Sequence, residues 1–329
     1  MKHLHTKYLG LELKSPVIAG SSGMTMSASK ARIMAQAGAG AIVLKSLFEE
    51  QINGESGVIE DSSCTDYPEA ADYIRAYTRS NSIDKYLDSI AEIKHAAGVP
   101  VIASVSCLSP NNWIDFAKQI ENAGANAMEL NLFYLPLDKN RKGTSYEQLY
   151  YDVVERVKAT VKIPIAVKLG ANFTNLLNVI QELHFRRVDG VVMFNKFYEP
   201  NIDINKMQIV PGNIFSHASD LRIALRWVAI VSAQIPQIDV SASTGIHDGT
   251  AAVKQLLAGA RTVQMTSALY QNGPEYIAKV LTFITEWMEK HGFKTLDDFR
   301  GKLHYGNIPD HELYERSQFM KYFSSKLEY

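Results

Sequence analysis

The stretch IDVSASTGIHDGTAAVKQLLAGARTVQMTS, which spans residues 238–267, shows how the fold is built. Two short apolar runs at Ile238–Ala242 and Thr262–Met265 flank a helical pattern at Gly249–Ala258. Gly259 stands where that helix should stop before the second run begins. Short, almost wholly apolar runs are typical of strands that a parallel sheet buries on both faces. The stretch therefore predicts one strand–helix–strand unit of a parallel α/β fold.

The same unit repeats along the chain. Eight apolar runs alternate with amphipathic helical patterns, and this alternation predicts a parallel α/β architecture. Eight units predict a closed ring, so we expect a (β/α)8 TIM barrel. A doubly wound sheet is the rival fold, but it usually carries a glycine-rich dinucleotide turn, and Gly20-Ser21-Ser22-Gly23 lacks that fingerprint. The predicted strands are Pro16–Gly20, Ala41–Lys45, Pro100–Ser104, Ala127–Asn131, Pro164–Lys168, Gly190–Phe194, Ile238–Ala242 and Thr262–Met265.

We expect a single barrel domain over residues 1–303, with two segments outside the repeat. A long polar loop at 47–81 follows the second predicted strand and contains a candidate short helix at Pro68–Tyr77. In a barrel this loop lies on the active-site face, where long loops are usually functional. The C-terminal extension, residues 304–329, has a helical pattern at Glu312–Lys326. We expect it to be helical and to pack on the outside of the barrel or on a neighbouring subunit.

Composition and charge exclude several classes of protein. The 34 basic and 35 acidic residues nearly cancel, so nucleic acid is not an expected partner. The two cysteines, Cys64 and Cys107, make neither a disulfide framework nor an iron–sulfur cluster, and we predict no metal site. The sequence starts without an apolar signal core, and no run reaches the ~18 apolar residues of a membrane span. We therefore expect a cytoplasmic protein that does not enter a membrane.

Polar residues stand at the ends of the otherwise apolar strands, which is where a (β/α)8 barrel carries its active site. Lys45 ends the second predicted strand and Lys168 ends the fifth. A buried ammonium group without a partner is costly, so two lysines at equivalent strand ends indicate an anionic or electron-rich ligand. The other strand-end candidates are Gly20, Ser21, Ser22, Ser46, Asn131, Asn195, Ser243, Thr244, Gly245, Thr266 and Ser267.

The last two strand ends have the features of a phosphate-binding cradle. Ser243-Thr244-Gly245-Ile246 precedes a predicted helix, so backbone N–H groups and a helix N-terminus can face an anion. Thr266 and Ser267 add hydroxyl groups from the neighbouring strand, and phosphate sites recur at this place in barrels. Ser, Thr and Gly are also common in plain loops, so each segment alone is weak. Their pairing on the seventh and eighth strands favours a phosphate site.

Several motifs on and around these strands stand in an order that belongs to a known family. They are Lys14-Ser15-Pro16-Val17-Ile18, Leu44-Lys45-Ser46, Glu129-Leu130-Asn131-Leu132, Ala166-Val167-Lys168-Leu169, the stretch from Ser243-Thr244-Gly245-Ile246 to Ala260, Val263-Gln264-Met265-Thr266-Ser267-Ala268-Leu269 and the segment Asp297-Asp298-Phe299-Arg300-Gly301-Lys302-Leu303. Together they resemble the dihydroorotate dehydrogenase family, and most closely its soluble class 1 members. The resemblance extends from about Leu9 to Leu303, and the last motif resembles the family's C-terminal helix.

The resemblance implies an FMN-dependent oxidoreductase that acts on a CH–CH bond, converting dihydroorotate to orotate in pyrimidine biosynthesis, and a homodimer. It implies that the FMN phosphate lies on Thr244, Gly245, Thr266 and Ser267. Lys168 would then lie beside the pyrimidine end of the flavin, where a fixed cation stabilises the anionic reduced ring. The residues expected around the flavin ring are Ser21, Ser22, Lys45, Ser46, Asn131, Lys168 and Asn195, and Gly20 and Ser243 are further cofactor-binding candidates.

The loop after the fourth strand departs from the family. Class 1 members place a cysteine base there, in an Asn-Leu-Ser-Cys-Pro-Asn run, whereas this chain has Asn131-Leu132-Phe133-Tyr134-Leu135-Pro136. Tyr134 therefore stands at the position of the base. With an ordinary pKa of about 10, a tyrosine is a poor base unless a cation such as Lys45 or Lys168 lowers that pKa, although it can serve as a general acid. Tyr134 is either the acid–base residue, with Lys45 as a second catalytic candidate, or a packing residue that fills the substrate cavity.

Other positions that bind substrate in the family are also changed. Residues 61–73 contain no Asn-x-x-Gly-x-x-Asn run, and Cys64 in this loop is interpreted as an exposed thiol rather than a replacement base. Ser216-His217 stands near the position of the family's Ser-Gly pair, and His217 alone is a weak candidate for a ligand contact. The changes all fall on the substrate side of the site, which argues against efficient turnover of dihydroorotate.

The leading hypothesis is therefore an FMN-dependent oxidoreductase that acts on a C–C or C=C bond of a small, planar, polar substrate. The alternative is a flavin-binding electron-transfer or partner subunit without dihydroorotate chemistry of its own. A third hypothesis is a barrel that binds a sugar phosphate and no flavin. The electron acceptor cannot be read from the residues, and an iron–sulfur acceptor would lie on another chain.

Overall fold

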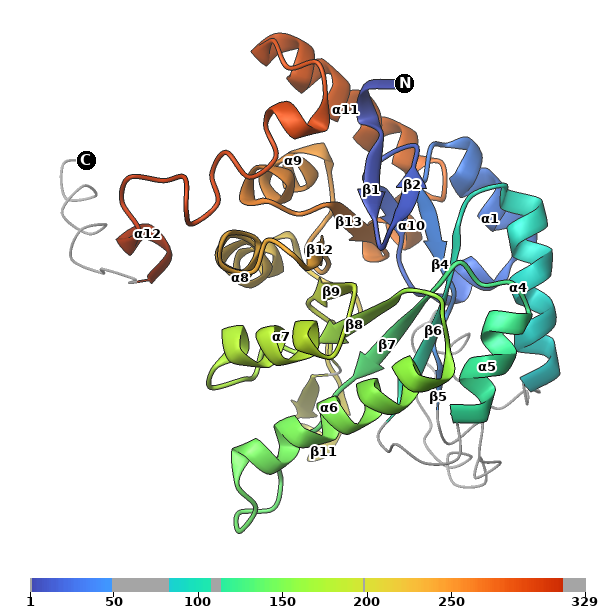
Figure 1. Cartoon of the computed structure of the whole chain (residues 1–329), viewed down its shortest axis with the longest axis vertical. Helices are drawn as coiled ribbons and strands as arrows, with labels where there is room; N and C mark the ends of the chain where they lie inside the picture. Colours follow the sequence, from blue (N-terminus) through green and yellow to red (C-terminus); the bar gives the residue numbers. More distant parts are fainter. Residues whose placement is uncertain (1, 49–82, 108–113, 198, 316–329) are drawn as a thin grey trace.

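The chain folds into the predicted (β/α)8 barrel (Figure 1). The computed structural model describes residues 2–48, 83–107, 114–197 and 199–315. Within these ranges the parallel strands follow the order β4-β3-β13-β12-β9-β8-β7-β6, and the pairing of β4 with β6 closes the ring. Each predicted strand corresponds to one strand of this ring. The strands are β3 (Val17–Ala19), β4 (Ala41–Val43), β6 (Val101–Cys107), β7 (Ala127–Leu132), β8 (Ile165–Leu169), β9 (Gly190–Met193), β12 (Asp239–Ala242) and β13 (Thr262–Met265).

A small antiparallel hairpin closes the amino-terminal end of the ring. It consists of β1 (Thr6–Tyr8) and β2 (Leu11–Leu13) and was not predicted from the sequence. Tyr8 is 1% exposed, and the backbone N–H of Leu9 donates to Asp239 Oδ2 at the start of β12 over 2.8 Å. Strand side chains alternate between the two faces, so every second residue points into the barrel. The buried cluster at this end comprises Tyr8, Leu9, Leu13, Ile18, Ala41, Val43, Ile102, Ala127, Ala166 and Val192.

Helices cover the outside of the ring (Figure 1). Each buries one apolar face; α8, for example, buries Leu221, Ala224, Val228 and Val231. Side chains cap several helix starts: Asp248 Oδ1 accepts from the backbone N–H of Ala251 at the start of α9 over 2.7 Å. Among the described helices, none is both long and apolar enough to cross a membrane. The outer helices are α1 (Ala28–Gln36), α4 (Ile83–Ala97), α5 (Ile114–Asn122), α6 (Gly143–Thr160), α7 (Leu176–Phe185), α8 (Leu221–Gln234), α9 (Gly249–Ala258) and α11 (Tyr276–His291).

A second unpredicted hairpin follows β9. Its strands are β10 (Pro200–Asp203) and β11 (Gln208–Pro211), with Ile202 opposite Ile209. Proline cannot donate to a sheet ladder, so the prolines at Pro200 and Pro211 weaken the sequence signal for strands. The hairpin is solvent-exposed and carries large apolar side chains. Their exposed fractions are 65% for Ile202, 82% for Ile204, 87% for Met207 and 76% for Ile209.

The segments expected outside the repeat are described only in part. The loop predicted at 47–81 starts later than expected, because β5 (Leu47–Phe48) pairs with Val105 and Ser106 of β6. The candidate helix Pro68–Tyr77 and Cys64 lie outside the described residues. In the C-terminal extension the structure describes one short helix, α12 (Glu312–Glu315), and the rest of the predicted helix, residues 316–326, also lies outside them.

The segment Asp297–Leu303 does not form the α-helix that the family resemblance implied. It consists of a 3-10 turn at Leu296–Asp298 followed by further turns. Two contacts of Arg300 hold it against the barrel, because its guanidinium donates to Ala260 O and to Thr6 Oγ1 over 3.2 and 2.7 Å. Gly301 then adopts a φ of +70°, which ends regular helical geometry.

Candidate active site

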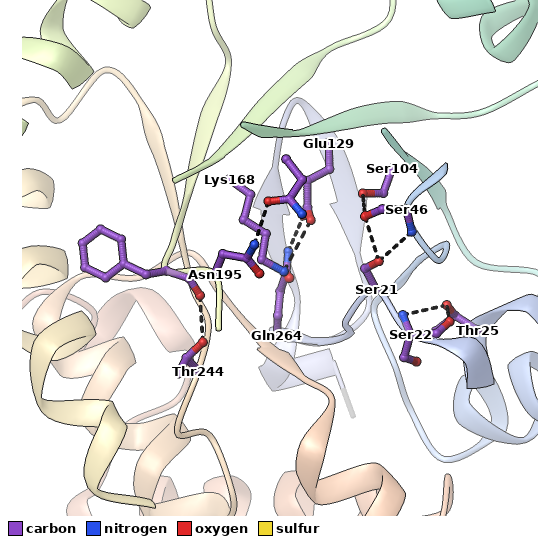
Figure 2. A network of polar contacts seen from close by, with 12 residues as sticks. Ser21, Ser22, Thr25, Ser46, Ser104, Glu129, Lys168, Asn195, Thr244 and Gln264 are labelled. Atoms are coloured by element: carbon purple, nitrogen blue, oxygen red, sulfur yellow. Dashed lines mark hydrogen bonds and ion pairs between the residues drawn. The ribbon is translucent and has the colours of Figure 1, made fainter. Parts of the chain in front are cut away.

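Polar side chains occupy the inside of the barrel at the carboxyl ends of its strands. Alternation along β4 leads from the buried Ala41 and Val43 to Lys45, and along β8 from Ala166 to Lys168. Along β7 it leads from Ala127 through Glu129 to Asn131. Because every second residue of a strand points into the barrel, the same alternation produces the apolar layers below and the polar layer above. Figure 2 shows this polar layer from close by.

The deepest part of the layer is a buried trio of Glu129, Lys168 and Gln264. Gln264 Nε2 donates to Glu129 Oε2 over 2.7 Å, and this bond crosses the barrel because β13 and β7 stand on opposite sides of the ring. Lys168 Nζ lies 3.7 Å from Glu129 Oε1. Glu129 is 1% exposed and Lys168 is 8% exposed. Lys168 is thus ion-paired, which corrects the inference that its charge needs an external ligand.

Two oxygen atoms of this trio remain without hydrogen bonds. Glu129 Oε1 and Gln264 Oε1 are buried and accept no hydrogen bond within the described part of the chain. Buried oxygens of this kind normally have a donor, so these two indicate that the layer is completed by something else. Glu129 and Gln264 were not among the predicted site residues. Glu129 stands two residues before Asn131, and Gln264 stands two residues before Thr266. This spacing places each on the same strand face as a predicted site residue, and it is the sequence signal that could have identified them.

Two predicted asparagines meet beside Lys168, which is the register partner of Asn131. Asn195 Nδ2 donates to Asn131 Oδ1 over 2.9 Å, which links the end of β7 with the loop after β9 (Figure 2). The backbone N–H of Asn195 donates to Leu169 O over 2.9 Å and fixes this loop to the end of β8. The pair leaves one amide NH2 and one carbonyl oxygen for other partners.

On the other side of the ring, three serines form a chain of contacts. Ser21 and Ser46 Oγ lie 3.3 Å apart, and Ser46 and Ser104 Oγ lie 2.8 Å apart (Figure 2). The backbone N–H of Ser46 also donates to Ser21 Oγ over 3.0 Å. Lys45 precedes Ser46, and its burial lowers the pKa of the ammonium group. An anionic ligand beside Lys45 would oppose this shift. The backbone N–H of Ser22 donates to Thr25 Oγ1 over 3.4 Å, and Thr25 Oγ1 donates to Ser22 O over 2.8 Å.

The predicted phosphate cradle forms a tight loop against a helix start. Thr244 and Gly245 both have left-handed backbones, with φ of +73° and +79°. Thr244 Oγ1 donates to Phe194 O over 2.8 Å (Figure 2). A Cβ on Gly245 would lie 2.2 Å from the backbone N of Leu221, the first residue of α8. The positive end of α8 therefore lies at the loop, in addition to the helix α9 that the sequence predicted. Ser243, buried before this loop, donates its backbone N–H to Met193 O.

The neighbouring strand end brings Thr266 and Ser267 to the same place. A Cβ on Gly20 would lie 2.4 Å from Thr266 Oγ1, so only glycine allows this approach. Ser267 Oγ accepts from the backbone N–H of Ser216 over 3.0 Å, and Ser216 Oγ lies 3.0 Å from His247 Nε2. His247 was not predicted, whereas the weak candidate His217 lies instead 2.7 Å from Asn213.

Tyr134 is fixed by its aromatic neighbours. Its ring meets Tyr150 edge-on with centroids 5.0 Å apart, and Tyr150 meets Phe173 in the same way at 5.3 Å. The backbone N–H of Tyr134 donates to Tyr150 Oη over 3.3 Å. Burial raises the pKa of Tyr150 to about 12, so this hydroxyl stays protonated. The hydroxyl oxygen of Tyr134 is buried. These contacts agree with a packing role and also hold the ring still for acid–base work.

Two hollows lie at the opposite end of the barrel. One of about 540 Å³ is lined by Leu9, Asp189 and Asp239, and one of about 220 Å³ by Arg261 and Arg300, among others. Asp189, Asp239 and Arg261 stand just before or at the first residues of β9, β12 and β13. Barrel enzymes carry their chemistry at the carboxyl ends of the strands, so neither hollow belongs to the candidate site.

A closed parallel ring with a polar layer at the carboxyl ends of its strands defines the class of (β/α)8-barrel enzymes. Within this class, the chain belongs to the dihydroorotate dehydrogenase family, whose family model, described as dihydroorotate dehydrogenase, matches residues 3–288. The enzymes of this family are oxidoreductases that act on CH–CH bonds.

Curated relatives match nearly the whole chain. The catalytic subunit of dihydroorotate dehydrogenase B (NAD(+)) from Methanocaldococcus jannaschii is 28% identical over 92% of this chain and 98% of its own length. The protein of the same name from Methanocella arvoryzae is 30% identical over 90% of this chain and 96% of its own. Dihydroorotate dehydrogenase A (fumarate) from Limosilactobacillus reuteri is 28% identical over 88% of this chain and 94% of its own.

Proposed function

We propose that this chain is an oxidoreductase that holds FMN at the carboxyl ends of its barrel strands and acts on a CH–CH bond of a small planar ring. The observation that carries the proposal is the buried trio of Glu129, Lys168 and Gln264. The pyrimidine edge of a flavin alternates carbonyl oxygens with one N–H group. Lys168 and the asparagine amides can donate to such oxygens, and Gln264 Oε1 or Glu129 Oε1 can accept the N–H.

The other end of the cofactor fits the tight loop after β12. A phosphate there would face the backbone of Thr244 and Gly245, the start of α8, and the hydroxyl groups of Thr266 and Ser267. Gly20 adds to the fit because its missing side chain leaves room beside Thr266. Ser21, Ser22 and Ser46 would border the flavin ring from the side of β3 and β4.

The residues of the chain divide the chemistry between them. FMN, when bound, supplies the hydride acceptor. Lys168 provides a fixed cation beside the pyrimidine edge and so stabilises negative charge there. Lys45 provides a second cation on the opposite side of the mouth. Tyr134, on the loop after β7, is the proposed general acid or base. It donates or accepts a proton at the substrate carbon adjacent to the carbon that exchanges the hydride.

The relatives named for dihydroorotate support a reaction of that type, which forms or removes the C=C bond of a planar ring. We further propose a homodimer in the cytoplasm. The exposed Ile202, Ile204, Met207 and Ile209 of the β10–β11 hairpin give it an apolar surface that a second subunit would cover. Two of the relatives are named catalytic subunits, which supports a separate protein as the electron acceptor.

One observation favours the alternative, a flavin-binding electron-transfer or partner subunit. Tyr134 packs into an aromatic cluster with Tyr150 and Phe173, and its hydroxyl oxygen is buried. If it only packs, the site lacks the acid–base group that the family's reaction needs. The two proposed functions therefore differ in the role of one atom, the hydroxyl oxygen of Tyr134: it either transfers a proton or only packs.

Tyr134→Phe removes that oxygen and keeps the ring. We expect anaerobic dihydroorotate to bleach the visible absorbance of the FMN-loaded wild type, slowly because the substrate loop is changed. Loss of a general acid or base lowers such rates by about 100-fold or more, and we expect this for Tyr134→Phe with an unchanged FMN content. Stopped-flow absorbance spectroscopy measures the bleaching rate.

Tyr146→Phe is the matched control, because this half-buried tyrosine in the first turns of α6 accepts a hydrogen bond from the backbone N–H of Asp138, in the connection that also carries Tyr134. It should bleach like the wild type. Equal bleaching rates for Tyr134→Phe and the wild type would assign Tyr134 to packing. No bleaching of the FMN-loaded wild type would remove dihydroorotate as a substrate and favour the alternative.

A further inference from the structure

Three side chains from different segments of the chain meet beside the proposed phosphate cradle. Ser216 lies in the loop before α8, His247 in the loop after β12, and Ser267 two residues beyond the end of β13. Ser216 Oγ lies 3.0 Å from His247 Nε2 and 3.1 Å from Ser267 Oγ. The backbone N–H of Ser216 also donates to Ser267 Oγ over 3.0 Å. The three side chains therefore form one connected row of polar groups.

The hydrogen atoms of this row point in one direction. A serine hydroxyl has one hydrogen to donate and two lone pairs with which to accept. The hydroxyl of Ser216 donates to Ser267 Oγ, so toward His247 it serves only as an acceptor. Nε2 of His247 must then carry the hydrogen of their 3.0 Å contact. The row is therefore a chain of donors that runs from His247 through Ser216 to Ser267.

Ser267 stands at the end of this chain of donors. Its oxygen accepts from the backbone N–H and from the hydroxyl of Ser216, so both of its lone pairs are used. Its own hydrogen goes to no acceptor among the residues that the structure describes. Hydrogen bonds to an ionised acceptor are stronger than those between neutral groups, and bonds in a chain polarise one another. The free hydrogen of Ser267 is thus suited to a phosphate oxygen.

Resting on the proposed FMN site, we infer that His247 and Ser216 are positioning residues that hold the hydroxyl of Ser267 as a donor to the FMN phosphate. Without the N–H of His247, a lone pair of Ser216 Oγ becomes free. Ser267 can then turn its hydrogen back toward Ser216 and present a lone pair to the anion, which repels it. His247 therefore helps the cradle to distinguish FMN from riboflavin, and it does so through Ser267.

Titrations of the full-length, flavin-free protein with FMN and with riboflavin test this inference. Ser267→Ala removes the direct donor, and the affinity for FMN should fall about 10- to 100-fold, as expected for a hydrogen bond to a charged group. His247→Leu and Ser216→Ala keep that donor but no longer fix its direction, so each should weaken FMN binding by about 5- to 10-fold. Riboflavin has no phosphate and should bind all three variants as it binds the wild type.

Two further variants separate positioning from a general effect on the loop. His247→Gln keeps an N–H donor at the end of the side chain, so its affinity for FMN should stay within about threefold of the wild type. Ser267→Ala combined with His247→Leu should bind FMN as weakly as Ser267→Ala alone, because His247 then has no hydroxyl to position.

His184→Leu is the control for His247→Leu. His184 is also a half-buried histidine, but it lies in the last turn of α7 and lines the larger hollow at the opposite end of the barrel. Its replacement should leave the affinities for FMN and riboflavin unchanged.

An unchanged affinity of His247→Leu for FMN would overturn the inference. Equal losses of FMN and riboflavin affinity would overturn it as well, because His247 would then only support the loop. Additive losses in the double variant would show that His247 acts independently of Ser267. Each of these results leaves the proposed function standing, whereas a wild type that binds no flavin, or binds both flavins equally, contradicts the proposed FMN site itself.

Discussion

Lys168→Met is expected to lower the free energy of unfolding by about 3–5 kcal/mol and to abolish the retention of FMN. Lys168 is the ion-pair partner of Glu129, which is 1% exposed and has one oxygen without a hydrogen bond in the described chain. Removing the ammonium leaves a buried carboxylate without a compensating charge. The same change removes the cation proposed to face the flavin. Chemical denaturation measures the first effect and visible absorbance after gel filtration the second.

The double variant Lys168→Met with Glu129→Gln separates the two effects. Both charges are then gone, while a glutamine at 129 can still bond Gln264, whose partner oxygen lies 2.7 Å away in the native protein. Replacing both members of a buried ion pair is often nearly neutral, so stability should recover. FMN should still be lost. Full FMN retention in either variant would show that Lys168 serves the barrel only.

Gly245→Ala is expected to lower the free energy of unfolding by about 2–5 kcal/mol and to weaken FMN binding strongly. The backbone at Gly245 has a φ of +79°, which costs any L-residue energy. The new Cβ would also lie 2.2 Å from the backbone N and 2.8 Å from the Cα of Leu221. Backbone atoms cannot rotate away as a side chain can. Either the loop or the start of α8 must therefore move, and both belong to the proposed phosphate site.

Gly98→Ala is the matched control for this prediction. Gly98 follows α4 with a φ of +63°, and a Cβ there would meet no atom within 4 Å. Gly98→Ala should lower the free energy of unfolding by about 1–2 kcal/mol, the cost of a left-handed backbone at a non-glycine residue, and leave FMN binding unchanged. If both glycine variants lost the same stability and both kept FMN, the close approach of Gly245 to α8 would have no functional meaning.

The ring of strands could be predicted because its strands are buried on both faces and appear as continuous apolar runs. The two hairpins lacked this signal. In β1, Thr6 and Tyr8 are buried around an exposed Lys7, which is too short an alternation to recognise. In β10 and β11, exposed isoleucines stand between prolines. Their positions depend on what the finished barrel leaves open, which no local pattern contains.

The candidate site could be predicted where residues lie next to strand ends and not where partners come from far along the chain. Ser21 meets Ser46 and Asn131 meets Asn195 at the carboxyl ends of the strands, where the sequence placed all four. Glu129 was read only as part of a motif, because its partner Gln264 is 135 residues away. The His247–Ser216 contact spans 31 residues and depends on how the chain returns from the β10–β11 hairpin. Alternation places a side chain inside the barrel but does not say which side chain it meets.

The central claim is that the carboxyl ends of the strands hold FMN, and a titration of the flavin-free protein with FMN and with riboflavin tests it most directly. The account predicts saturation at one FMN per chain. Riboflavin should bind about 100-fold more weakly, because it lacks the phosphate that Thr244, Gly245, Thr266 and Ser267 are proposed to hold. A protein that takes up neither flavin would contradict the account and favour a sugar-phosphate barrel. Equal affinity for the two flavins would place the cofactor away from the β12–β13 cradle.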